Sequence, residues 1–176
     1  PLDARLAAFR AALAAEEARL VAVSSRWGAE VRSLASLLVL ARAYADFAAA
    51  RPAAWHLLAV SVGDPRELVP AGEGAEMVTS VGALMAWCAA RFDAARAAGA
   101  LDAAGEGASV RQAVMYWSAV HGALQLRKLA RFGLPGVEAG SLVDDAAQTL
   151  LRGCGADPAR VREAARRVDR SRGAEP

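Results

Sequence analysis

Hydrophobic residues recur every three or four positions along most of the chain, which is the spacing of one face of an α-helix. The pattern is clearest near the N-terminus, where it predicts a helix from about Leu2 to Val23. Further helices are predicted over about residues 29–50, 53–61, 75–98, 109–132, 137–152 and 158–169. We therefore expect an all-α fold, an antiparallel bundle of about six to seven helices.

Glycine, proline and capping residues predict where these helices begin and end. The segment Gly63–Gly74 contains two prolines and reads as a loop. Gly99 is suited to the left-handed backbone conformation that often follows the end of a helix. Ser109 and Gln112 have the spacing of a capping box, and Asp157-Pro158 is typical of a helix start.

Composition favours helix as strongly as the pattern does. About a quarter of the residues are alanine, and the chain lacks isoleucine and asparagine, so strand-forming residues are scarce. With 176 residues, of which 55% are hydrophobic, one domain is expected to span residues 1–176. Within it, we assign residues 1–34 to an N-terminal helix and connector, 35–155 to the core, and 156–176 to a basic terminal helix and tail.

Charge and targeting signals exclude several classes of protein. The net charge of +2 is too balanced to indicate a nucleic-acid-binding chain. The longest nearly uncharged stretches are shorter than the roughly 20 residues that span a bilayer, and no secretory signal is present, so we expect a cytoplasmic protein without a membrane partner. Two cysteines, Cys88 and Cys154, do not make a disulfide framework.

The chain offers little catalytic or metal-binding chemistry. Its two histidines, His56 and His121, fall in different predicted helices, and neither has a second ligand at metal-binding spacing. No nucleotide-binding or nucleophile motif occurs, so we expect no metal, no cofactor and no catalytic residue. An enzyme using His56 or His121 as a general base is a weaker alternative, because no positioned partner is visible for either.

Polar and polarisable side chains on apolar helix faces suggest a ligand pocket instead. Pockets between helices are mostly apolar with a few convergent polar groups. The candidate ligand-binding residues are Tyr44, Trp55, His56, Met85, Trp87, Cys88, Met115 and Tyr116. The alternative is an ordinary core with a few satisfied polar atoms.

The two predicted helices over 109–132 and 137–152 carry more apolar surface than one small bundle can cover. Trp117, His121 and Gln125 share one face at four-residue spacing, and the following helix has a similar surplus. Pairing with a second copy would give a two-fold, four-helix interface. The candidate interface residues of this homodimer are Trp117, His121, Gly122, Leu124, Gln125, Val143, Ala147 and Leu150.

Three segments resemble the C-terminal regulatory domain of TetR-family transcriptional repressors. They are ARAYADFAAARPAAW at 41–55, MYWSAVHGALQL at 115–126 and DDAAQTLLRG at 144–153, and the resemblance spans about residues 35–155. It implies a helical ligand-sensing domain for a small hydrophobic effector, whose last two long helices form the dimer bundle. The sequence departs from the family in one respect: residues 1–34 contain no helix-turn-helix.

This resemblance leads to two hypotheses of different classes. In the first, the chain is the dimerisation and ligand-sensing domain of a TetR-like regulator, and contacts DNA only through a helix-turn-helix absent from this chain. Either the domain is cut from a longer repressor or the DNA-binding unit is missing. In the second, it is a stand-alone helical small-molecule-binding or protein-interaction module that does not bind DNA.

Overall fold

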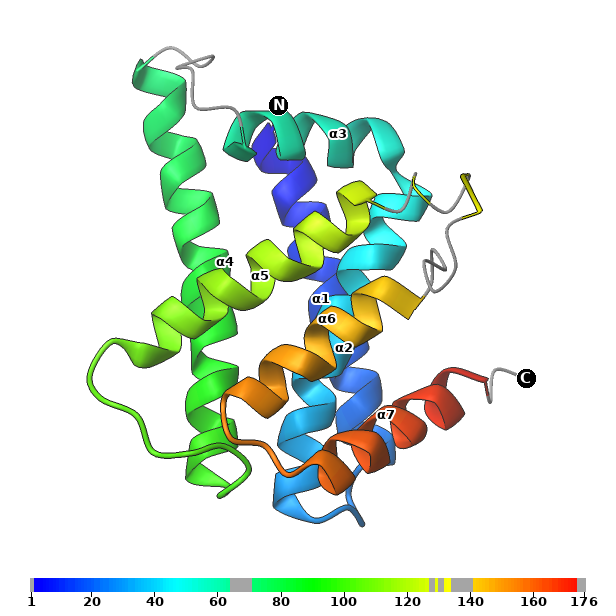
Figure 1. Ribbon diagram of the computed structural model, residues 1–176. Coiled ribbons are helices and arrows are strands. Elements are labelled where there is room, and N and C mark those ends of the chain that lie inside the picture. Colours follow the sequence, from blue (N-terminus) through cyan, green and yellow to red (C-terminus); the bar gives the residue numbers. More distant parts are fainter. Residues whose placement is uncertain (1, 64–70, 127–128, 130–131, 134–140, 174–176) are drawn as a thin grey trace.

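The computed structural model (Figure 1) describes residues 2–63, 71–126, 129, 132–133 and 141–173, which form seven α-helices and no β-strand. The all-α prediction is confirmed for this part of the chain. The helices are α1 (Leu2–Val23), α2 (Ala29–Ala50), α3 (Pro52–Gly63), α4 (Ala71–Ala97), α5 (Ala108–Leu126), α6 (Ser141–Gly153) and α7 (Pro158–Gly173).

Helix α2 is the centre of the bundle and contacts all the other helices. It has apolar residues around most of its circumference, and an all-round apolar helix is stable only when neighbours surround it. By length and composition alone α2 could also cross a membrane, but most of it is buried inside the bundle, as in the core helix of a soluble protein. Arg51 ends the helix because the residue before a proline is disfavoured in the helical region.

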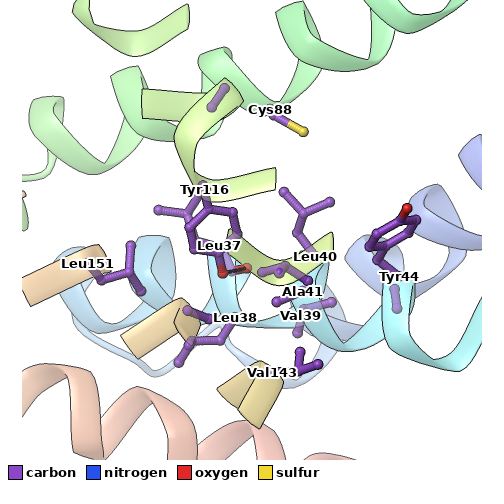
Figure 2. Close-up of a cluster of buried hydrophobic side chains, with 14 of the residues drawn as sticks. Leu37, Leu38, Val39, Leu40, Ala41, Tyr44, Cys88, Tyr116, Val143 and Leu151 are labelled. Carbon is purple, nitrogen blue, oxygen red and sulfur yellow. Dashed lines mark hydrogen bonds between the residues drawn. The ribbon is translucent and has the colours of Figure 1, made fainter. Parts of the chain in front are cut away.

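The other helices cover α2 from different sides. In Figure 1, α5 and α6 run side by side across one face, with α2 behind them and α4 along one edge. Figure 2 shows Leu38 of α2 directed toward Val143 and Leu151 of α6, while Leu40 and Tyr44 are directed toward the side where Cys88 of α4 lies. Helix α2 therefore separates two layers of core, one against α6 and one against α4.

Ion pairs fix α6 and α7 against α2. Arg42, a buried residue, donates to both carboxylate oxygens of Asp144 at 2.8 and 3.0 Å. It also contacts Asp169 of α7 at 2.6 Å. Helix α7 runs alongside α2 in the same direction: Arg160 near its start pairs with Glu30 near the start of α2, and Arg172 near its end pairs with Asp46 near the end of α2. This ion pairing sets the register of three helices.

Most of the predicted helix ends are confirmed. Helices α1 and α2 have the expected bounds, and Gly99 adopts the left-handed conformation with φ of 73°. Asp157 caps α7, since its carboxylate accepts from the backbone N–H groups of residues 159 and 160. Helix α7 continues to Gly173, one turn beyond the predicted end.

One predicted helix start is wrong, and so is the predicted capping box of α5, although α5 itself begins at Ala108, one residue from its predicted start. Helix α4 begins at Ala71 rather than near residue 75, because a chain can retain glycines inside a helix at a cost of about 1 kcal/mol each. Ser109 and Gln112 do not form a capping box: both side chains bond Arg96 of α4, and Ser109 also bonds Asp93. The predicted segments 127–132 and 137–140 lie largely outside the described residues.

Candidate functional site

A small apolar cavity lies where α1, α2, α4 and α5 meet. Its volume is about 10 Å³, which is room for a single water molecule. Helix α1 contributes an aromatic ring, α2 and α5 contribute most of the wall, and α4 closes the side opposite α2. The lining residues are Phe9, Leu40, Ala41, Tyr44, Leu84, Cys88, Tyr116, Trp117 and Val120.

An aromatic cluster surrounds one end of this cavity. It consists of Phe9, Tyr44, Phe47, Trp55, Trp117 and His121, and draws on four helices. Tyr44 is its centre: its ring centroid lies 5.3 Å from that of Phe9 and 6.0 Å from that of Trp117. Tilted rings at these separations attract one another beyond the area they bury.

A hydrogen-bond chain leads from the cluster to the surface. The Tyr44 hydroxyl lies 2.7 Å from Nδ1 of His121, and Nε2 of His121 lies 2.9 Å from the exposed side-chain amide of Gln125. Burial lowers the pKa of His121, so the ring is neutral at pH 7 and carries one hydrogen. One ring nitrogen then donates and the other accepts, so the orientation of the Gln125 amide fixes the direction of the bond to Tyr44.

Burial keeps the ionisable groups of the cavity neutral. It raises the pKa of the Cys88 thiol to about 12, and it raises the pKa of the Tyr44 and Tyr116 hydroxyls above their usual value of 10.0. Within the described residues, no group of three histidine, cysteine or acidic side chains could hold a metal ion. The site is suited to binding an apolar molecule.

One polar group of the cluster has no hydrogen-bond partner. The indole Nε1 of Trp117 is buried, and no acceptor in the described structure meets it in hydrogen-bond geometry. The indole N–H groups of Trp55 and Trp117 lie near the Tyr44 oxygen. There they favour the charged form of Tyr44 and partly offset the effect of burial, which raises its pKa. A buried donor left unpaired costs about 1–3 kcal/mol.

A larger groove lies between α1 and α4, with a volume of about 380 Å³. Leu84 lines both the groove and the cavity, so this side chain stands between them. Arg91 holds the two helices together at the groove: it binds both carboxylate oxygens of Glu17, at 2.6 and 2.5 Å, and lies 3.6 Å over the Trp87 ring. The groove alone is within the size range of small-molecule pockets.

The outward side of α5 is unusually apolar. Of the seven large hydrophobic residues that are exposed in the described structure, five lie between Val110 and Phe132. We call this surface the outer face. By helical spacing we assign to it Val110, Val114, Met115, Ser118, Gly122, Gln125 and Leu126 of α5, together with Thr149 and the half-buried Leu142, Ala146 and Leu150 of α6.

The structure brings part of the predicted pocket set together. Tyr44, Cys88 and Tyr116 line the cavity, Trp55 joins the aromatic cluster, Met85 is buried in the core, and Trp87 lines the groove. His56 and Met115 do not join them. Both side chains are exposed, Met115 by 54%, because they lie on the outward sides of α3 and α5.

The predicted interface set divides in a similar way. Leu124, Val143 and Ala147 are buried within this chain and offer no surface to a second copy. Trp117 and His121 belong to the cavity side, since Trp117 lines the cavity and His121 bonds Tyr44. Gly122, Gln125 and Leu150 lie on the outer face, where contact with another molecule is possible.

Five cavity residues were not identified from the sequence: Phe9, Leu40, Ala41, Leu84 and Val120. Phe9 lies on the apolar stripe of α1, Leu84 lies on that of α4, and both are buried. Their periodicity gave no sign of which helix each would meet. An isolated phenylalanine on a stripe otherwise made of leucines was the available signal for Phe9.

Comparison with known families gives one match. A family model described as "Tetracyclin repressor-like, C-terminal domain" matches residues 37–150, which include most of α2, all of α3 to α5 as described, and most of α6. No curated protein and no solved structure matches the chain.

Proposed function

The chain belongs to the tetracyclin repressor-like C-terminal domain family, and from this premise we propose that it senses a small hydrophobic effector and controls DNA binding by a dimeric, cytoplasmic regulator. Domains of this family are regulatory modules that bind ligands and dimerise, and they are not enzymes. Residues 1–176 act in this proposal as a single domain. DNA is contacted through a helix-turn-helix that this chain does not contain.

The observation that carries the proposal is the cavity and its aromatic cluster. Four helices contribute to it, and its lining is uncharged. A cavity of about 10 Å³ does not admit an effector, whereas the neighbouring groove of about 380 Å³ does. We infer that the effector enters from the groove and moves Leu84 and Phe9, which joins groove and cavity into one pocket.

Phe9 links the pocket to helix α1. Its ring contacts Tyr44 and Phe47 of α2, so an effector occupying the cavity moves α1 relative to α2. The bidentate pair between Glu17 and Arg91 holds the other half of α1 on α4. The effector then selects one of two positions of α1, and its influence on DNA binding is limited by its difference in affinity for them.

The outer face supports dimerisation. Val110, Val114, Met115 and Leu126 are each 45–54% exposed. Contiguous apolar surface of this kind is typical of a contact with another protein. Two copies of α5 and α6 would form a four-helix interface about a two-fold axis. The bond chain from Tyr44 through His121 ends at Gln125 on this face, which gives the pocket a physical connection to the dimer.

A cysteine pair in the chain allows a controlled test of the effector site. Cys88 lines the cavity, whereas Cys154 lies at the end of α6 and does not. The Cys88→Met variant fills the cavity with a flexible side chain, and Cys154→Met makes the same change elsewhere. A thermal-shift screen with small hydrophobic compounds should find stabilising compounds for the wild type and Cys154→Met but not for Cys88→Met.

Two results of this screen would contradict the proposal. One is that no compound raises the melting temperature of the wild type. The other is that compounds stabilise Cys88→Met as much as they stabilise Cys154→Met, which would place their binding outside the cavity.

A further inference from the structure

The hydrogen-bonding groups of the cavity are almost all in use. The Tyr116 hydroxyl donates to the backbone oxygen of Leu37 at 2.7 Å, and the Tyr44 hydroxyl is bonded to His121. The Trp117 indole N–H is buried and lies near the Tyr44 oxygen, but no acceptor in the described structure, this oxygen included, meets it in hydrogen-bond geometry. An indole nitrogen can only donate, so the group lacks an acceptor atom and nothing else.

The lining of the cavity carries no charged side chain, and the charged residue that lines the neighbouring groove, Arg10, does not line the cavity. Arg91, whose charge reaches Cys88, is neutralised by both carboxylate oxygens of Glu17. A charged ligand would lose its hydration on entering and find no counter-charge in the lining, and this loss is large for any ion in an apolar site. The cavity therefore favours a neutral ligand.

Aromatic rings provide much of the wall. Phe9, Tyr44, Tyr116 and Trp117 line the cavity from three helices. Flat rings stack or meet edge to face with such walls at low cost in side-chain entropy. A planar aromatic skeleton matches this surface better than a branched aliphatic one.

We propose, on the premise that this cavity is the effector site, that it binds a neutral aromatic compound with a hydrogen-bond-acceptor oxygen, and that the Trp117 indole N–H donates to that oxygen. Binding then pairs a donor that the empty site leaves unpaired, so the gain exceeds that of a hydrogen bond exchanged with water. Aromatic rings can also attract cations, but this surface has no carboxylate to add to that attraction.

Four compounds with one bicyclic skeleton separate these properties. Indane has no polar group, 1-indanone adds a neutral acceptor, 1-aminoindane is a cation at pH 7, and indane-1-carboxylate is an anion. Calorimetry with the 176-residue chain should show 1-indanone binding about tenfold more tightly than indane, which corresponds to about 1.4 kcal/mol. The two ions should bind more weakly than indane.

Replacement of single tryptophans locates the donor. The Trp117→Phe variant keeps an aromatic wall without the N–H, and should reduce the preference for 1-indanone over indane to within about twofold. Trp27→Phe is the matched control, because Trp27 packs against Arg167 of α7 and does not line the cavity. This variant should retain the tenfold preference.

A second readout uses the unaltered protein. The carbonyl stretch of bound 1-indanone should lie at lower frequency than in a hydrocarbon solvent, because a donated hydrogen bond weakens the C=O bond. Tighter binding of the amine, a preference that survives in Trp117→Phe, or an unshifted carbonyl stretch would each overturn the inference and leave the proposed function intact. Failure of all four compounds to bind would count against the cavity as the effector site.

Discussion

Gly122 provides a way to disturb the outer face without disturbing the monomer. It lies within α5 on that face, and a Cβ atom built there meets nothing within 4 Å. Gly82 of α4 has the same open surroundings and is exposed, but does not belong to the outer face, where Gly122 is partly exposed. Arginine at either position therefore fits the isolated chain, and only arginine at 122 would meet a second copy.

The expected energies of the two variants differ in sign and size. Replacing a glycine inside a helix by arginine stabilises the folded chain by somewhat less than about 1 kcal/mol, and this gain applies equally to Gly122→Arg and Gly82→Arg. At 122, an unpaired guanidinium would also be buried between two copies, which costs several kcal/mol. A net cost of about 4 kcal/mol weakens the dimer about a thousandfold.

Sedimentation equilibrium over a range of protein concentrations measures this change. Wild type and Gly82→Arg should sediment as dimers and Gly122→Arg as a monomer, all three with the same helical circular dichroism. A dimeric Gly122→Arg would refute the placement of the interface. A monomeric Gly82→Arg would show that the loss of the dimer has another cause.

Three other predictions test the core and the pH response. In urea denaturation, Arg42→Met should lower the free energy of unfolding by about 2 kcal/mol, which is less than for a fully buried ion pair because the Asp144 carboxylate is partly hydrated. Asp169→Asn should lower it by under about 1 kcal/mol, because the Asp169 side chain is 63% exposed. Burial lowers the pKa of His121 below 6.5, so just below that pH the unfolded chain binds more protons than the folded chain. The free energy of unfolding of the wild type should therefore fall as the pH drops from 7.5 toward 5.5. A His121→Gln variant whose stability has the same pH profile as the wild type would contradict this. Gly155→Ala should lower the melting temperature because Gly155 has φ of 91° and its Cβ would collide with a neighbouring side chain, while Gly153→Ala, with open space, should not; equal effects would remove the argument.

Periodicity predicted the helices well because each helix records its own buried face. Helix α2 was placed correctly from the three- to four-residue spacing of its hydrophobic residues, and α7 from Asp157-Pro158. These signals are local and involve only residues of the same segment. The start of α4 was missed because glycine weakens a helix without ending it.

The site was predicted less completely, because the periodicity of a helix shows which face is buried but not which other helix packs against it. Trp117 and His121 were correctly expected to share a side of α5. They were expected to contact a second copy, but in the structure both contact Tyr44 of the same chain. Ala147 was expected at an interface, and instead its side is buried against the chain's own core. Such pairings depend on how the helices cross, which the spacing of residues does not encode.

Isotope-filtered NMR on an equimolar mixture of labelled and unlabelled chains tests most directly the central claim that two copies dimerise through the outer face. Nuclear Overhauser effects between the two kinds of chain report only contacts that cross from one copy to the other. The methyl groups of Val114, Met115 and Leu150 on the outer face should give such effects. Their absence there, or their appearance only at the exposed Val21 and Val23 of α1, would contradict the claim.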